Sequence, residues 1–169
     1  ASVPAADFKG WNEKQRLAFL INLYNAATIR LVLDHHPVRS IKDIGGAKGT
    51  KTQPVVKALG KTHTLDEVGH QLIRGNFAEP RIHFALNCGA RSCPPFAAWQ
   101  QATLDADLER ATGAYLAAES ARSAGGSLLT MPRLLRWYRG DFGGRAGILA
   151  LLRRHGVIGP DETPRLRYG

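Results

Sequence analysis

A long, almost uninterrupted apolar stretch near the N-terminus constrains the fold more than any other part of the chain. From Leu17 to Leu33 nearly every residue is apolar or small. Asn12, followed three residues later by Gln15, matches the capping box that starts many helices. We therefore predict a helix over residues 12–35. Because a helix that is apolar all round must be covered by other parts of the protein, it should form the buried centre of the fold.

Two amide side chains interrupt this apolar stretch on one helical face, Asn22 and Asn25. A buried amide must be hydrogen-bonded, because an unpaired polar group in the interior costs stability. Two interpretations are open. The amides tie down a neighbouring loop, or they take part in a functional site by orienting a catalytic group or binding substrate.

Weaker signals place further elements around this helix. A capping box at Thr64 and Glu67 predicts a helix that stops at Gly75, and Gly60 marks the turn of a hairpin over residues 54–63. The other expected elements are a helix over 105–119, a strand over 127–131, a short helix or strand over 132–138 and a last helix over 145–155. We expect a flexible loop over residues 46–51 and a polar, loosely ordered tail over residues 160–169.

These elements predict an α+β fold in a single domain over residues 1–169, with its core over residues 11–156. The expected body is mostly helical and surrounds the long buried N-terminal helix, with a small antiparallel sheet beside it. A chain of 169 residues is long enough to bury a sizeable core.

Charge and composition narrow the classes of partner. The formal net charge is +9, with 44% hydrophobic and 22% charged residues, as in an ordinary basic globular protein. The basic residues are scattered and aromatics are not regularly interleaved with them, which disfavours nucleic acid, whereas an anionic surface fits. No apolar run approaches a membrane span and no signal peptide is evident, so both an exported or periplasmic and a cytoplasmic location are open.

Both cysteines and one of the six histidines fall within a single block, residues 81–95. Apolar and polar or small side chains alternate over residues 81–87, a period typical of a strand with one buried face. The polar face of this predicted strand carries His83, which could act as a titratable group there.

The end of the same block predicts a reactive cysteine. Proline disfavours the helical conformation in the residue before it and is favoured at the first position of a helix. Pro94 should therefore start a helix, and Cys93 should be its N-cap. Amides and the positive dipole end at a helix start lower the pKa of a thiol and raise its thiolate fraction.

Three other interpretations of the cysteines stay open. Cys88 and Cys93 could form a disulfide across a four-residue loop, as in exported proteins, or be inert buried side chains. They could also join two histidines in a zinc site, although their spacing is looser than is usual for zinc. We predict neither a metal nor a cofactor.

The leading functional hypothesis is a thiol-dependent hydrolase or acyl-transferase that acts on a peptide or amide bond, or on a small thiol substrate. Cys93 would be the nucleophile, with His83 or else His70 as the general base and Asn25 holding the imidazole. This layout is loosely that of a rearranged papain-type site. The predicted substrate-binding residues are Arg74, Arg81, Arg91 and Asn22. The competing hypothesis is a non-catalytic peptide- or protein-binding module with structural cysteines.

Five sequence blocks between Trp11 and about Gly156 together resemble the DUF547 domain family, a domain of unknown function. The blocks are AFLINLYNAAT from Ala18, PVRSIKDI from Pro37, TLDEVGH from Thr64, PRIHFAL from Pro80 with the later Cys88 and SCPP, and WY with DF from Trp137. Such a resemblance implies an extracytoplasmic site, since many bacterial members carry an export signal. It also implies thiol or small-peptide chemistry, since some eukaryotic members are fused to glutaredoxin-like domains. Gly69 departs from the family pattern, which has Glu before the helix histidine.

Overall fold

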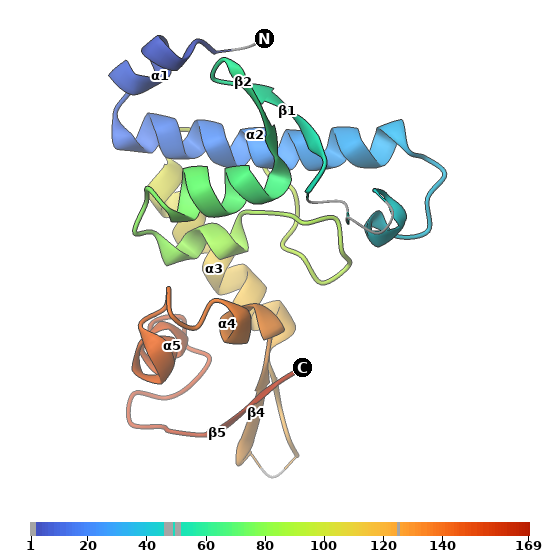
Figure 1. Cartoon of the computed structure of the whole chain (residues 1–169). Helices are drawn as coiled ribbons and strands as arrows, with labels where there is room; N and C mark the ends of the chain where they lie inside the picture. Colours follow the sequence, from blue (N-terminus) through green and yellow to red (C-terminus); the bar gives the residue numbers. More distant parts are fainter. Residues whose placement is uncertain (1–2, 46–48, 50–51, 125) are drawn as a thin grey trace. The chain divides into compact units, whose positions relative to one another are not determined.

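The computed structural model describes residues 3–45, 49, 52–124 and 126–169 of the chain (Figure 1). It forms two compact units, which are described separately below. Unit 1 is Ala1–Ala78 with Phe84–Asp107, and unit 2 is Glu79–His83 with Leu108–Gly169. The prediction that the whole chain is one domain stays a prediction. The loop predicted over residues 46–51 falls almost entirely outside the described residues.

The predicted long helix is confirmed as α2, Glu13–Asp34, at the centre of unit 1. Its capping box is formed as the sequence predicts, with the Gln15 amide donating to Asn12 Oδ1 over 2.9 Å and the Asn12 amide donating to Gln15 Oε1 over 3.0 Å. The buried residues of α2 are Leu17, Ala18, Leu20, Ile21, Tyr24, Asn25, Thr28 and Leu31. By length and composition alone α2 could also cross a membrane. In unit 1 it serves as a core helix instead.

The remaining elements of unit 1 pack around α2. The hairpin of β1, Pro54–Ala58, and β2, Lys61–Thr64, lies against it, and so does the π-helix η4, Glu67–Arg74. Leu59 and Gly60 form the predicted tight turn, with φ of 53° and 75°, the positive values that two-residue hairpin turns require. The shorter elements are α1, Ala5–Gly10, and the 3₁₀ helix η1, Ile41–Asp43.

Two predictions about the cysteine block are wrong. In place of the predicted strand the structure has the 3₁₀ helix η5, Pro80–Phe84. Four consecutive side chains here, Ile82, His83, Phe84 and Ala85, are at most 4% exposed. Four consecutive buried side chains do not fit a strand with one solvent-facing side. The helix predicted from Pro94 is also absent, since residues 94–100 form neither helix nor strand.

Unit 2 contains most of α3, Leu104–Glu119, whose ends the sequence predicts within one residue. Its sheet has the order β3-β4-β5, antiparallel between β3 (Ala121–Arg122) and β4 (Leu128–Met131) and parallel between β4 and β5 (Arg165–Tyr168). The helices α4, Arg133–Trp137, and α5, Gly144–Arg154, complete the unit.

The C-terminal tail is therefore more ordered than predicted. The sequence predicts a polar, loosely ordered tail over residues 160–169, but part of it forms β5. In this strand Leu166 and Tyr168 are partly buried and alternate with the exposed Arg165 and Arg167. This period-two pattern is that of an edge strand with one covered face. With its small sheets and mostly helical body around α2, the protein has the α+β fold predicted from sequence.

Candidate functional site

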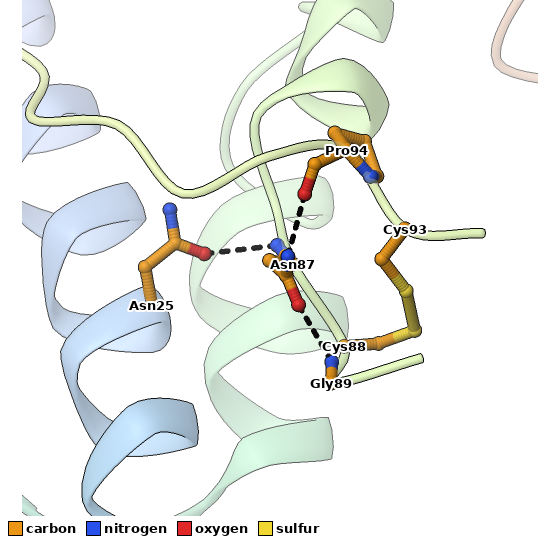
Figure 2. The surroundings of a disulfide bond; sticks show 6 residues. All are labelled: Asn25, Asn87, Cys88, Gly89, Cys93 and Pro94. Carbon is orange, nitrogen blue, oxygen red and sulfur yellow. Dashed lines mark hydrogen bonds between the residues drawn. A yellow bond between two sulfur atoms is a disulfide. The ribbon is translucent and has the colours of Figure 1, made fainter. Parts of the chain in front are cut away.

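In unit 1 the two cysteines are joined to each other. Cys88 and Cys93 form a disulfide, with their Cα atoms 6.0 Å apart, and neither is present as a free thiol (Figure 2). Gly89, whose φ is 78°, turns the chain inside this loop. The thiol pKa predicted from a helix start does not apply to a bonded sulfur, and that helix is absent. A Cys93 nucleophile therefore stays a prediction for the reduced protein only.

A chain of side-chain amides fixes the backbone around this loop. Asn25, 4% exposed, donates to the Ala85 carbonyl over 2.9 Å and accepts from the Asn87 amide over 2.9 Å. Asn87 in turn donates to the Pro94 carbonyl over 2.6 Å and accepts from the Gly89 amide over 2.7 Å (Figure 2). Both ends of the disulfide loop are thus tied through Asn87 to α2.

Asn22, one helical turn before Asn25, holds the chain farther along. Its amide donates to the Trp99 carbonyl over 2.8 Å, and its oxygen accepts from the Trp99 amide over 3.0 Å. Asn22 therefore pairs with both backbone groups of Trp99, in a part of the chain that forms no helix. Between the Pro94 and Trp99 anchors, residues 95–98 are exposed. Of the two interpretations of these amides, the structure shows the loop-tying one.

Two of the predicted sequence blocks pack closely within unit 1. The end of the Ile41 side chain, from the 37–44 block, lies 2.5 Å from where a Cβ on Gly89 would stand, and the positive φ of Gly89 favours glycine at this point of the disulfide loop. Gly69, from the 64–70 block, lies against the Tyr24 ring, 3.4 Å from its ideal Cβ position.

His83 lies in unit 2, where a carboxylate holds its ring. Its side chain is 3% exposed, and Nε2 is 2.7 Å from Asp141 Oδ2. The Tyr138 ring stacks on the imidazole with centroids 3.7 Å apart and planes 14° from parallel, and Phe142 lies at 5.7 Å. The imidazole is therefore fixed in plane and in direction. In the sequence, Asp141 appears only as an acid among aromatics, 58 residues after His83.

Arg81, one of the predicted substrate-binding residues, is ion-paired. It contacts Glu79 at 2.6 Å and Glu109 at 2.9 Å, and its side chain is 17% exposed. Glu109 also receives Arg154 at 2.6 Å and faces His155 Nε2 at 3.4 Å. This group of two carboxylates, two guanidiniums and one imidazole is called the Glu109 cluster below.

Burial lowers the pKa of His155 below its ordinary value, and the two arginines of the Glu109 cluster, Arg154 and Arg81, lower it further. Glu109 acts in the opposite direction by stabilising the protonated ring. The burial effect is the largest of these and decides the direction.

The other predicted site residues lie on the surface of unit 1. His70 is exposed on η4, with Nδ1 3.0 Å from Arg74 and Nε2 4.0 Å from Asp66. Arg91 is exposed within the disulfide loop. Asn22, Asn25 and the cysteines are thus brought together in unit 1, whereas His83 and Arg81 belong to unit 2. Among the described residues, no group of three or more His, Cys, Asp or Glu side chains is arranged to hold a metal ion.

Comparison with known proteins gives one match. A sequence model of the family described as "Protein of unknown function, DUF547" matches residues 8–116. No curated protein and no solved structure matches the chain. The matched range includes four of the five sequence blocks, from α2 to the disulfide loop. The block with Tyr138 and Asp141 lies beyond it.

Proposed function

The chain belongs to the DUF547 family of proteins of unknown function, and we propose that unit 1 is a peptide-binding module whose cysteines are structural. One observation carries the proposal. Residues 95–98 are exposed in a segment without helix or strand, which is held at Pro94 by Asn87 and at Trp99 by Asn22.

A backbone held in this way suits the recognition of an extended peptide. Binding is stronger when the binding segment is already ordered, because less conformational entropy is lost on association. Main-chain groups of an extended segment can pair with a second extended chain, and its side chains select the sequence. Phe96, 45% exposed, offers an aromatic contact, and Arg91 in the adjoining loop offers a charge for an acidic side chain or carboxylate. The ligand class is therefore an extended peptide with an apolar and an acidic residue.

The test is selection of peptides from a random peptide library by the oxidised protein, followed by titration calorimetry. Phe96→Ala should weaken binding of a selected peptide at least about tenfold, as expected for an aromatic anchor. Leu33→Ala is the matched control, since Leu33 is 65% exposed on α2, and it should leave the affinity unchanged. A peptide that binds equally well to both variants would contradict the proposed site.

A second candidate function is the thiol-dependent hydrolase or acyl-transferase, with Cys93 as nucleophile and His70, which lies in the same unit, as base. One observation favours it. The His70 ring lies 3.0 Å from Arg74 through Nδ1 and 4.0 Å from Asp66 through Nε2, and such contacts orient a general base for proton transfer. This activity requires reduction of the disulfide, and its substrate would be a peptide or amide.

A reduced and an oxidised sample separate the two functions. Peptide hydrolysis that appears only after reduction, and is lost in both Cys93→Ser and His70→Ala while Cys88→Ser retains it, would support the enzyme. Peptide binding by the oxidised protein without turnover would support the binding module. Rapid alkylation of Cys93 at pH 6 after reduction is the further sign of an activated thiol.

We also propose that the protein works in an exported or periplasmic setting. Disulfides persist in oxidising compartments and are rare where thiols are kept reduced. Mass measurement of the non-reduced protein from each compartment tests this, with a mass lower by two hydrogen atoms expected only in the exported material.

A further inference from the structure

The short helix α4 in unit 2 exposes a tryptophan beside two arginines. Arg133 and Arg136 are three residues apart and Arg133 and Trp137 four apart, so the three side chains share one helical face. All three are exposed, Trp137 by 66%, whereas Leu135 on the opposite side is fully buried. Trp137 is also the most exposed large apolar side chain among the described residues of either unit.

Arg133 and Arg136 differ from several other arginines of unit 2, which are ion-paired. Arg81 and Arg154 bind Glu109, and Arg122 binds Glu162. In contrast, across the described residues no hydrogen bond or ion pair engages the guanidinium of Arg133 or Arg136. The α4 surface therefore presents uncompensated positive charge around an exposed indole ring.

We propose that this surface, Arg133, Arg136 and Trp137, docks unit 2 on a membrane that carries anionic phospholipids. Tryptophan favours the membrane–water interface, where its ring is apolar and its N–H stays hydrated. Arginine binds lipid phosphates through paired hydrogen bonds, and each basic residue near an anionic bilayer strengthens binding about fivefold. One aromatic contact combined with neighbouring charges gives reversible, salt-sensitive attachment.

Single-stranded nucleic acid would also meet a positive charge here, but the α4 surface fits lipid better. Strand-binding proteins stack successive bases on several aromatic side chains along a charged groove. Within the described part of unit 2, Trp137 is the one large apolar side chain that is strongly exposed. A single indole ring beside two arginines fits a flat layer of lipid headgroups better than it fits a strand of nucleic acid.

The experiment uses the full chain and vesicles of phosphatidylcholine, with or without phosphatidylserine. Wild type should co-sediment with the phosphatidylserine vesicles, with a blue shift of tryptophan emission. Arg133→Glu with Arg136→Glu should weaken this binding about 25-fold or more, since two favourable charges are lost. Trp137→Ala should weaken it and abolish the emission shift. Circular dichroism verifies that each variant is folded.

The matched control is Arg165→Glu with Arg167→Glu, which makes the same change in net charge on exposed positions of β5. Equal loss in both double variants would overturn the proposal, because net charge rather than the α4 surface would then explain binding. If soluble glycerophosphate alone caused the same emission shift, the surface would be binding free phosphate, and the proposal of a membrane ligand would be overturned. Tighter binding of a single-stranded oligonucleotide, lost in Trp137→Ala, would replace lipid with nucleic acid.

Discussion

The two units use different kinds of interaction outside their apolar cores. In unit 1 neutral amides, from Asn22, Asn25 and Asn87, and one disulfide fix the loop between η5 and α3. In unit 2 charged groups join the elements, since Glu109 on α3 binds Arg81, Arg154 and His155, and Glu162 binds Arg122 of β3.

This contrast determines how each unit responds to solution conditions. Neutral amides do not titrate and are little affected by salt, so unit 1 should keep its loop over a wide pH range. Partly exposed ion pairs weaken with salt and with protonation of the carboxylate. Four variants test this difference, in order of decreasing effect.

The largest loss of stability is expected from Asn25→Ala in unit 1. Removing this amide leaves the Ala85 carbonyl and the Asn87 amide buried without their partner, which should cost about 3 kcal/mol. Urea denaturation measures the loss, which should be the same in low and high salt. Asn76→Ala is the control, because Asn76 is exposed, and it should cost much less. A salt-dependent loss for Asn25→Ala would contradict the comparison.

Removing the disulfide should have the next largest effect. The double variant Cys88→Ser, Cys93→Ser removes the cross-link that restricts the unfolded chain, so the unfolded state gains entropy. By the chain-entropy relation, the free energy of unfolding should fall by about 2 kcal/mol. The same loss should appear when wild type is reduced, and reductant should not affect the double variant. If reduction leaves the thermal midpoint of wild type unchanged, the loop is held by the amides alone.

Glu109→Gln in unit 2 should cost about 1 kcal/mol at low salt, because the partly exposed ion pairs with Arg81 and Arg154 are lost. This loss should shrink in high salt, unlike that of Asn25→Ala. It should also lower the pKa of His155 further, since Glu109 is the group that raises it against burial. NMR titration of the His155 ring measures the pKa, and an upward shift would contradict the assignment.

Glu162→Gln should have the smallest effect of the four variants, and this effect should be present at neutral pH and disappear in acid. The hydrogen bonds from Arg122 and from the Gly159 amide lower the pKa of Glu162 to about 2, from an ordinary value of 4.5. Its stabilising contribution is therefore complete above pH 4.5 and lost as the pH falls toward 2. Glu162→Gln should flatten this part of the stability profile, measured by thermal unfolding, whereas Asp161→Asn should leave the contribution in place.

The sequence predicts the helices well because their signals are local. Asn12 and Gln15 define the start of α2, and the apolar residues after them account for its burial. The hairpin turn at Leu59 and Gly60 follows from the same kind of short-range rule.

The cysteine block was predicted less well because distant residues decide its conformation. Asn22 and Asn87 hold the two ends of the segment from Pro94 to Trp99, which forms no helix despite the local preference of proline for a helix start. Likewise Asp141 reaches His83 across 58 residues, a pairing that no local pattern contains. The long-range hydrogen bonds of both units had to be seen in the structure.

The parallel pairing of β4 with β5 has a consequence for the order of folding. β4 is made before α4 and α5, but its parallel partner follows both of them, and until then only the two-residue β3 can pair with it. During synthesis from the N-terminus, one edge of β4, the strand that carries Leu129 and Met131, therefore has no partner strand until β5 has been made. That interval is when a ribosome-bound intermediate of this protein would be most prone to aggregate or to recruit a chaperone.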